Sequence, residues 1–286
     1  PHQNQQRYEP FGEIDFSLKT LERNFGWLRK IFIVTDRQRF PLSGLSPAFA
    51  SRITFVDHRE IIPGDVVPLP TFNSSVIEAF LHRIEGLSDT FLYLNDDMFV
   101  ASPISYSDLI DPEGVPYSFV EPRRLTPLGR RAQLETARQW PDVVHHGARD
   151  HITADLFEDV IGVRPPSVRP THVGTMLTRQ AEAETLRLFA DRLDSVLSHR
   201  LRSSFAVRWM VLSTWTALHF GWVTPVPLAK HRGESIFVNS DLHPDIVDML
   251  ITRPHKFVCI NVTEARLAEY ERLKQFYLDE LDGSAS

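Results

Sequence analysis

Residues 91–100 read F-L-Y-L-N-D-D-M-F-V, so that three oxygen-bearing side chains directly follow a short apolar run. An apolar run of this length with aromatic residues is typical of a buried strand. In open α/β sheets, ligands bind beyond the carboxyl ends of the strands. Two adjacent carboxylates repel each other unless a cation or a shared proton relieves them. Asn95, Asp96 and Asp97 are therefore a candidate Mg²⁺ or Mn²⁺ site, with a solvated turn or a helix cap as the alternative.

The composition is that of an ordinary globular protein, with 42% hydrophobic and 24% charged residues among 286. A formal net charge of −6 provides no basic field, so nucleic acid is not an expected partner. No apolar run approaches the roughly 18 residues that a membrane span needs. The single cysteine, Cys259, lies between Val258 and Ile260, which predicts a buried thiol. We expect a cytoplasmic protein without a transmembrane segment, with peripheral contact at the inner face of the membrane left open.

Apolar strands alternate with amphipathic helices along much of the chain. Their order indicates an α/β sandwich around a mostly parallel sheet. A capping box from Ser75 to Glu78 is expected to open one of the helices. The predicted strands are 30–35, 52–56, 91–94 and 256–260, and the predicted helices are 13–29, 75–84, 180–198, 205–220, 243–251 and 264–281.

Residues 101–170 have a different character, because proline, glycine and arginine are frequent there and hydrophobic periodicity is weak. We interpret this stretch as a variable insert or lid. The chain is then a single catalytic domain, 1–286, with its core formed by 1–100 and 171–286.

Further polar groups follow the other predicted strands. Asp36, Asp57 with His58, and Asn261 each stand at a strand end. If these strands share one parallel sheet, their polar groups converge with Asn95–Asp97 on one crevice. The alternative for Asp36, Asp57 and His58 is that they only form turns.

Two segments are candidates for binding an anion. Asn73 and Ser74 precede a helix, whose free N–H groups and dipole favour a phosphate, although many helix caps have this composition. Arg200 and Arg202 form a basic group, and arginine is suited to bidentate phosphate contact. A cluster that neutralises a helix C-terminus is the alternative for these arginines.

Several stretches together resemble one known family. Residues 7–38, which include I-F-I-V-T-D-R-Q (31–38), and 69–99, which include L-P-T-F-N-S-S (69–75), resemble the second conserved region of the Stealth family. His172 with H-R-L-R-S-S-F (199–205) resembles the third region, and K-F-V-C-I-N (256–261) resembles the fourth. The family comprises sugar-phosphate transferases, among them capsular and exopolysaccharide phosphotransferases and the catalytic subunit of the lysosomal-enzyme N-acetylglucosamine-1-phosphotransferase.

The resemblance implies a Rossmann-like α/β fold and a specific reaction. A sugar 1-phosphate would pass from a UDP-sugar donor to a hydroxyl of a polysaccharide or glycan acceptor, releasing UMP with the help of Mg²⁺ or Mn²⁺. His172 would be the general base, a role that suits the ordinary pKa of histidine. By the same resemblance Asp97 and Arg202 would be catalytic, the metal ligands would be Asn95, Asp96, Asp97 and Asn261, and substrate would be bound by Arg7, Glu13, Asn73, Ser74 and Arg200.

The chain departs from the family pattern at three acidic positions. Pro10 and Phe11 replace an Asp-Asn pair after Arg7, Phe205 and Ala206 stand where an aspartate follows Arg202, and Val262 follows Asn261. The family's first region would lie upstream of residue 1, and the chain begins with proline, not methionine. We predict a sugar-1-phosphate transferase. The alternatives are a metal-dependent glycosyltransferase that transfers no phosphate, and an inactive glycan- or nucleotide-binding relative.

Overall fold

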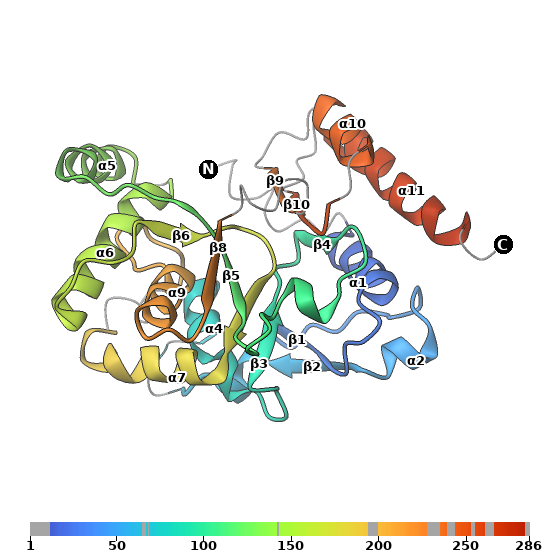
Figure 1. Ribbon diagram of the computed structural model, residues 1–286, viewed down its shortest axis with the longest axis horizontal. Helices are drawn as coiled ribbons and strands as arrows, with labels where there is room; N and C mark the ends of the chain where they lie inside the picture. Colours follow the sequence, from blue (N-terminus) through green and yellow to red (C-terminus); the bar gives the residue numbers. More distant parts are fainter. Residues whose placement is uncertain are drawn as a thin grey trace.

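Small groups of hydrogen-bonded strands, covered by helices, make up the computed structural model of the chain (Figure 1). It describes residues 12–64, 67, 69–141, 143–193, 200–227, 235–238, 244–252, 255–260 and 266–283. The expected α/β class is confirmed. The parallel part is present but small, because three of the six strand pairings in these ranges are parallel and three are antiparallel.

The first pairing joins two strands that the sequence predicts. Helix α1 (Glu13–Asn24) leads to β1 (Ile31–Thr35), which pairs in parallel with β2 (Ile53–Asp57) after the short helix α2 (Pro47–Ala50). Thr35 lies opposite Asp57 in this ladder. Helix α3 (His58–Ile61) begins directly after β2, with Asp57 as its N-cap. The parallel register therefore places Asp36, Asp57 and His58 beside one another.

Helix α4 (Ser74–Phe80) is capped differently from the sequence prediction. Its N-cap is Asn73, whose side chain accepts a hydrogen bond from the Ser75 N–H group at 3.2 Å, so the predicted capping box that starts at Ser75 is wrong. The helix begins at Ser74, so Ser75 lies inside its first turn, where its hydroxyl accepts a hydrogen bond from the Arg149 guanidinium at 2.9 Å. The helix also ends earlier than expected and continues as the 3₁₀ turn η3 (Leu81–Arg83).

Two antiparallel pairings join distant parts of the chain. Strand β3 (Thr90–Tyr93) pairs with β7 (Thr175–Thr178). Strand β4 (Met98–Val100) pairs with β10 (Phe257–Ile260), which also pairs in parallel with β9 (Ser235–Val238). Consecutive strands β3 and β4 thus belong to different pairings, and the segment between them lies where these pairings meet.

The stretch 101–170 contributes one strand that pairs with a later part of the chain. After the 3₁₀ turn η4 (Tyr106–Asp108), strand β5 (Tyr117–Pro122) pairs in parallel with β8 (Thr224–Pro227) and antiparallel with β6 (Val168–Pro170). Two helices separate β5 from β6: α5 (Pro127–Gln139) and α6 (His146–Ile161). The interpretation of residues 101–170 as an insert or lid stays a prediction. Strand β5 of this stretch is hydrogen-bonded to β8.

The main core surrounds α9 (Trp209–His219), as the two tryptophans in this apolar segment predict. Trp209 and Trp215 are fully buried and pack with Phe157 of α6 and Phe189. Phe189 lies between helix α7 (Arg179–Leu188) and the 3₁₀ turn η5 (Ala190–Arg192). Figure 1 shows α5, α6, α7 and α9 gathered on one side of the strands.

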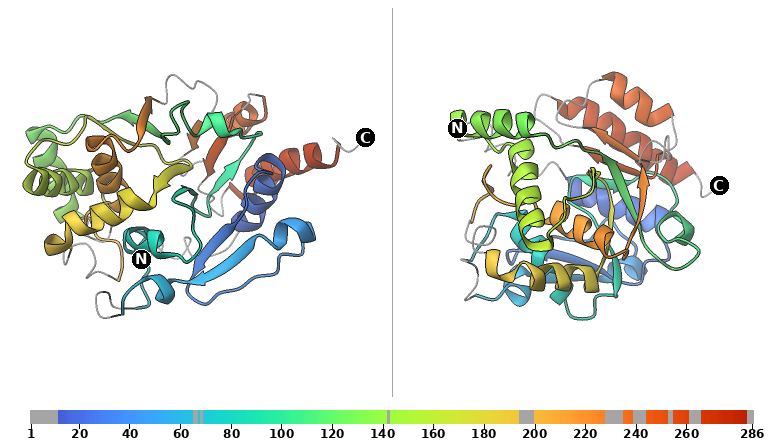
Figure 2. Two further views of the ribbon diagram at one scale, coloured as in Figure 1. Left: turned by 60° about the horizontal axis from the view of Figure 1, so that its bottom comes forward. Right: turned by 60° about the vertical axis from the view of Figure 1, so that its left-hand side comes forward.

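The C-terminal helices lie on the opposite side. Helices α10 (Pro244–Thr252) and α11 (Leu267–Gly283) pack together, and α11 also contacts α1 (Figure 2). Tyr270 and Leu273 of α11 join Phe16 of α1 and Phe99 of β4 in a second buried cluster. Of the helices in the described part of the chain, none has the length and hydropathy required to cross a membrane.

Candidate active site

The Asn95–Asp97 segment forms the turn between β3 and β4. The β3–β7 pairing sets Tyr93 opposite Thr175, which brings the loop that carries His172 alongside this turn. The β4–β10 pairing sets Met98 opposite Cys259, and the Ile260 N–H group donates to the Asp97 carbonyl oxygen at 2.8 Å. Three distant segments therefore meet at one point.

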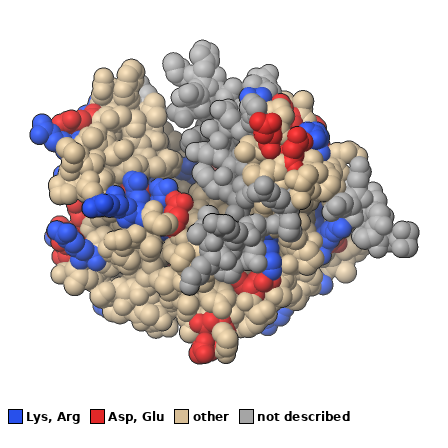
Figure 3. Space-filling view, turned by 45° about the horizontal axis from the view of Figure 1, so that its top comes forward, with Lys and Arg blue, Asp and Glu red and all other residues tan. Residues whose placement is uncertain are grey.

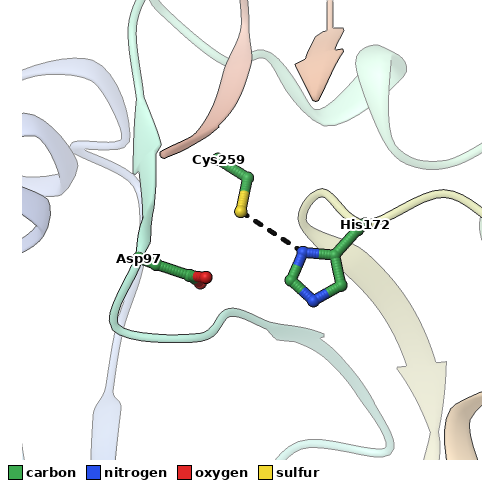
Figure 4. A group of neighbouring side chains, drawn as sticks. All are labelled: Asp97, His172 and Cys259. Atoms are coloured by element: carbon green, nitrogen blue, oxygen red, sulfur yellow. Dashed lines mark hydrogen bonds between the residues drawn. The ribbon is translucent and has the colours of Figure 1, made fainter. Parts of the chain in front are cut away.

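Asp97, His172 and Cys259 meet there, with their potential metal-ligating atoms all within 4.8 Å of one another. Figure 4 shows the Asp97 carboxylate and the Cys259 thiol directed towards the imidazole from two sides. His172 Nδ1 lies 3.2 Å from Cys259 Sγ, and His172 Nε2 lies 3.4 Å from Asn95 Nδ2. The predicted base and the predicted metal-site triplet are thus in direct contact.

Asp97 lies in surroundings that disfavour its charge. Burial, followed by the neighbouring Asp96 carboxylate, raises the pKa of Asp97 to about 6. Its Oδ1 atom is buried and has no hydrogen-bond partner among the residues that the structure describes. A bound cation would relieve both the desolvation and the repulsion from Asp96. Asp97 and Asp96 therefore fit a site for a hard divalent cation, whose ligands are oxygen atoms.

Glu13 lies close to these carboxylates. Helix α1 begins at Glu13, and the small pocket beside it is lined by Glu13, Phe16, Asp96, Asp97, Met98, Phe99, Ile260 and Tyr270. The pocket combines three carboxylates with an apolar wall. The pocket therefore brings Glu13 to the same side of the turn as Asp96 and Asp97.

Asn95 contacts the base through its amide nitrogen, while its amide oxygen is engaged elsewhere. The Tyr93 hydroxyl donates to Asn95 Oδ1 at 2.5 Å. The same hydroxyl oxygen lies 3.2 Å from Oε1 of Glu78, a buried residue of α4. Burial raises the pKa of Glu78, against the opposing effect of Arg202 and Arg149. Tyr93 and Glu78 thus form a second layer behind Asn95.

Positive charge faces the imidazole. Burial, followed by the charges of Arg208 and Arg202, lowers the pKa of His172 to about 4. Arg202 is exposed and extends its field over Asp97 and Glu78 as well. His172 is therefore neutral at neutral pH, with an unprotonated ring nitrogen in the field of two guanidinium groups.

A buried carboxylate holds Arg208 in place. Asp150 of α6 is completely buried and pairs with Arg208 at 2.7 Å, with Arg123 at 3.0 Å and with Arg169 at 3.3 Å. The neighbouring Arg149 donates to the carbonyl oxygens of Ala206 and Val207 and to Ser75 of α4. Segment 200–208 is thereby fixed against α4 by two adjacent residues of one helix.

Lys and Arg side chains gather on one part of the surface, with some Asp and Glu beside them, although the chain carries net negative charge (Figure 3). Figure 3 shows a group of Lys and Arg side chains on the α5 and α6 side of the molecule. Such a local field attracts anionic ligands.

The remaining predicted residues lie near α4 or outside the described ranges. Asn73 is buried and caps α4, and Ser74 hydrogen-bonds to Glu78. Arg200 donates from Nε to the Pro70 carbonyl oxygen at 2.9 Å, so it contacts the segment that precedes α4. Arg7 and Asn261 lie outside the described residues.

The polar strand ends form two groups. Within the part of the chain that the structure describes, Asp36, Asp57 and His58 make up one group, and Asp97, His172 and Cys259 make up another. In the first, the Arg59 guanidinium pairs with both Asp36 and Asp57, and Asp57 caps α3. These contacts agree with the turn-forming alternative for Asp36 and Asp57.

Sequence reasoning missed four members of the site. Tyr93, Glu78 and Arg208 gave no signal that distinguishes them from strand, helix-cap and surface residues. Cys259 was recognised as a buried thiol, and its position two residues before Asn261 could have indicated its place beside the site.

Comparisons with known proteins agree with the resemblance. The model of Stealth protein CR2, conserved region 2, matches residues 7–118. The capsular polysaccharide phosphotransferase fcs1 of Haemophilus influenzae is 32% identical over 196 residues, which are 68% of this chain and 50% of that protein. A capsular polysaccharide phosphotransferase of Actinobacillus suis is 38% identical over 128 residues, covering 45% of this chain and 34% of that protein.

A third relative is matched over nearly the whole chain. Exopolysaccharide phosphotransferase SCO2592 of Streptomyces coelicolor is 28% identical over 277 residues, which are 94% of this chain and 27% of that protein. The chain thus spans half or less of the length of these three relatives.

Among solved structures, apo mouse xyloside xylosyltransferase 1 is similar with a TM-score of 0.42 and 10% identity, over 95% of this chain and 89% of that one. This similarity is too low to indicate a shared activity. The chain belongs to the Stealth family, because it matches conserved region 2 of that family and is similar to several capsular and exopolysaccharide phosphotransferases.

Proposed function

We propose that this chain carries the catalytic centre of a sugar-1-phosphate transferase that acts in capsule or exopolysaccharide synthesis. The donor is a UDP-sugar, the acceptor is a hydroxyl of a glycan, and the released nucleotide is UMP. The observation that carries the proposal is the meeting of His172 with Asp97 under the charge of Arg202 and Arg208. The relatives named as capsular and exopolysaccharide phosphotransferases support it.

His172 acts as the general base in this proposal. Its lowered pKa leaves the ring neutral at neutral pH, so one ring nitrogen carries a lone pair that can take a proton once the acceptor hydroxyl displaces the 3.4 Å contact with the Asn95 amide. A bound phosphate group offsets the charges of Arg202 and Arg208, which raises the pKa of His172 and strengthens it as a base when substrate is present. The pKa of His172 thus comes near the value that suits a general base only when substrate is bound.

The reaction is a phosphoryl substitution. The acceptor hydroxyl gives its proton to His172 Nε2 and its oxygen bonds to the sugar-linked phosphorus. The bond from that phosphorus to the bridging oxygen breaks, and UMP leaves with that oxygen. Arg202 and Arg208 offset the negative charge on the phosphate during this exchange. Such a step depends on positioning and charge stabilisation.

A divalent cation is the expected cofactor. Asp97, with its unpartnered buried Oδ1 atom, and Asp96 would hold it, together with Asn261 as the sequence predicts. When bound, Mg²⁺ would neutralise the charge of the donor diphosphate. The Asn95 oxygen already accepts from Tyr93, so this amide supports the base more directly than the metal.

One observation favours a second candidate, an inactive binding relative. Phe205 and Ala206 stand where family members have an aspartate after Arg202. The nucleotide product separates the candidates. UMP release identifies phosphate transfer, UDP release identifies a simple glycosyltransferase, and no release with UDP-sugars identifies a binding protein.

A further inference from the structure

Cys259 lies inside the candidate active site on β10, a buried strand that is paired on both sides. All four residues of β10 are buried, and the strand is hydrogen-bonded to β4 on one side and β9 on the other. The Cys259 side chain is fully buried and points between His172 and Asp97 (Figure 4). A thiol on such a strand has little freedom to move, because both neighbouring strands hold its backbone.

The contacts around Asn95 determine the tautomer of His172. The Tyr93 hydroxyl donates to Asn95 Oδ1, so the amide oxygen faces Tyr93 and the NH₂ group faces the imidazole. An amide nitrogen can only donate. Nε2 of His172 is therefore the acceptor, and in a neutral imidazole the proton then lies on Nδ1.

The Nδ1 proton is directed at sulfur. His172 Nδ1 lies 3.2 Å from Cys259 Sγ, which is within hydrogen-bond distance for sulfur. The Nδ1–H group therefore donates a hydrogen bond to Sγ. The thiol's own hydrogen is left for Asp97, which has a carboxylate oxygen within 4.8 Å of Sγ. The order of contacts is Asn95, His172, Cys259 and Asp97, with one donor and one acceptor at each step.

We propose that Cys259 is a positioning residue that joins the base His172 to Asp97 and holds the imidazole in the tautomer with Nε2 unprotonated. The catalytic role of this tautomer rests on the function proposed above, since Nε2 is the atom that would take the acceptor proton. A carboxylate orients the histidine directly in many hydrolases. Here a thiol is inserted between histidine and carboxylate, which leaves Oδ1 of Asp97 for a cation.

The test compares Cys259→Ala with Cys259→Ser and Val258→Ala in the full-length protein. Alanine removes both hydrogen bonds, whereas serine keeps one donor and one acceptor. Val258 is the adjacent fully buried residue of β10 and packs in the cluster around Phe16, so Val258→Ala controls for lost core volume. Thermal unfolding of all three variants establishes how far each is destabilised.

Two readouts decide the proposal. The ¹⁵N shifts of His172, assigned by difference from His172→Gln, are expected to show protonated Nδ1 and unprotonated Nε2 in wild type and in Cys259→Ser, and a mixture of tautomers in Cys259→Ala. With donor and acceptor present, kcat is expected to fall about 10- to 100-fold in Cys259→Ala with little change in KM, the size seen when a supporting contact of an active residue is lost. Cys259→Ser should recover most of this loss, and Val258→Ala should keep wild-type kcat.

The proposal is overturned if the tautomer of His172 is the same in wild type and in Cys259→Ala, or if the wild-type ring carries its proton on Nε2. It is overturned equally if Cys259→Ala and Val258→Ala lose the same kcat. The ¹⁵N measurement needs no turnover. If the wild type transfers no sugar phosphate but shows the tautomer change, the positioning role stands and the proposed function fails.

Discussion

His172 Nε2 lies 3.4 Å from Asn95 Nδ2, although the two residues are 77 positions apart in the sequence. The contact arises because β3 and β7 pair antiparallel, with Tyr93 opposite Thr175. It links the predicted base to the turn predicted to bind metal. The orientation of the Asn95 amide is fixed in turn by the Tyr93 hydroxyl.

Asn95→Asp tests this contact. The substitution replaces a donor facing Nε2 with a carboxylate, which favours a protonated imidazole. We expect the pKa of His172, about 4 in the wild type, to rise by about one unit or more. Titration of His172 followed by NMR measures the shift. Tyr93→Phe is the control, because it frees the amide without adding charge, and an equal shift in both variants would contradict the electrostatic explanation.

Asp97→Asn tests the cation site without relying on turnover. Mg²⁺ in the millimolar range should raise the Tm of the wild type, because a ligand that binds the folded state stabilises it. The variant should show no such rise. Without Mg²⁺ at pH 7.5, it should be more stable than the wild type by on the order of 1 kcal/mol, since a partly buried carboxylate is removed. Glu85→Gln, at an exposed carboxylate, should respond to Mg²⁺ as the wild type does, and a wild-type response in Asp97→Asn would exclude Asp97 as a ligand.

Asp150→Asn tests the support of Arg208. Asp150 is completely buried among three arginines, and breaking a buried ion pair costs about 3–5 kcal/mol. We expect a loss of that order in urea unfolding, together with weaker UDP-sugar binding. The matched control on the same helix is Asp155→Asn. Asp155 and Arg130 are both 47% exposed, so its loss should cost less than about 1 kcal/mol. Equal losses in the two variants would refute the supporting role of Asp150.

Glu182 makes the free energy of unfolding depend on pH. Burial raises its pKa from 4.5 to about 7, against the opposing hydrogen bond from Trp209 Nε1. The folded state therefore holds a proton that the unfolded state releases between about pH 4.5 and 7, and this contribution to stability is lost as pH rises through that range.

Glu182→Gln should remove this dependence and be more stable than the wild type at pH 8. The free energy of unfolding, measured by urea titration at several pH values, reports the change. Glu184→Gln on the same helix, where Glu184 pairs with Arg187, should keep the wild-type pH dependence. A wild-type pH dependence in Glu182→Gln would show that Glu182 does not titrate in this range.

The sequence predicted the elements better than their pairing. Strands 30–35 and 52–56 were predicted within one residue, because continuous apolar runs mark buried strands. The β3–β7 and β4–β10 pairings were not predicted, since they join segments far apart in the chain and depend on tertiary packing. Strand β5 was missed because its segment carries weak periodicity.

The same distinction holds for the site. Asp97 and His172 were predicted from residue type and resemblance, and the structure brings them together. Arg208 was missed because only the burial of Asp150 shows that it is held there. Cys259 was predicted to be buried, but its contact with His172 depends on the β4–β10 register.

The most direct test of the proposed function is ³¹P NMR of the products formed from a UDP-sugar and a glycan acceptor with Mg²⁺. Donors that carry different sugars are supplied in turn to the full-length protein and to His172→Gln. We expect UMP together with a sugar phosphodiester on the acceptor from the wild type, and neither product from His172→Gln. Release of UDP with a plain glycoside, or equal UMP release by the wild type and His172→Gln, would contradict it.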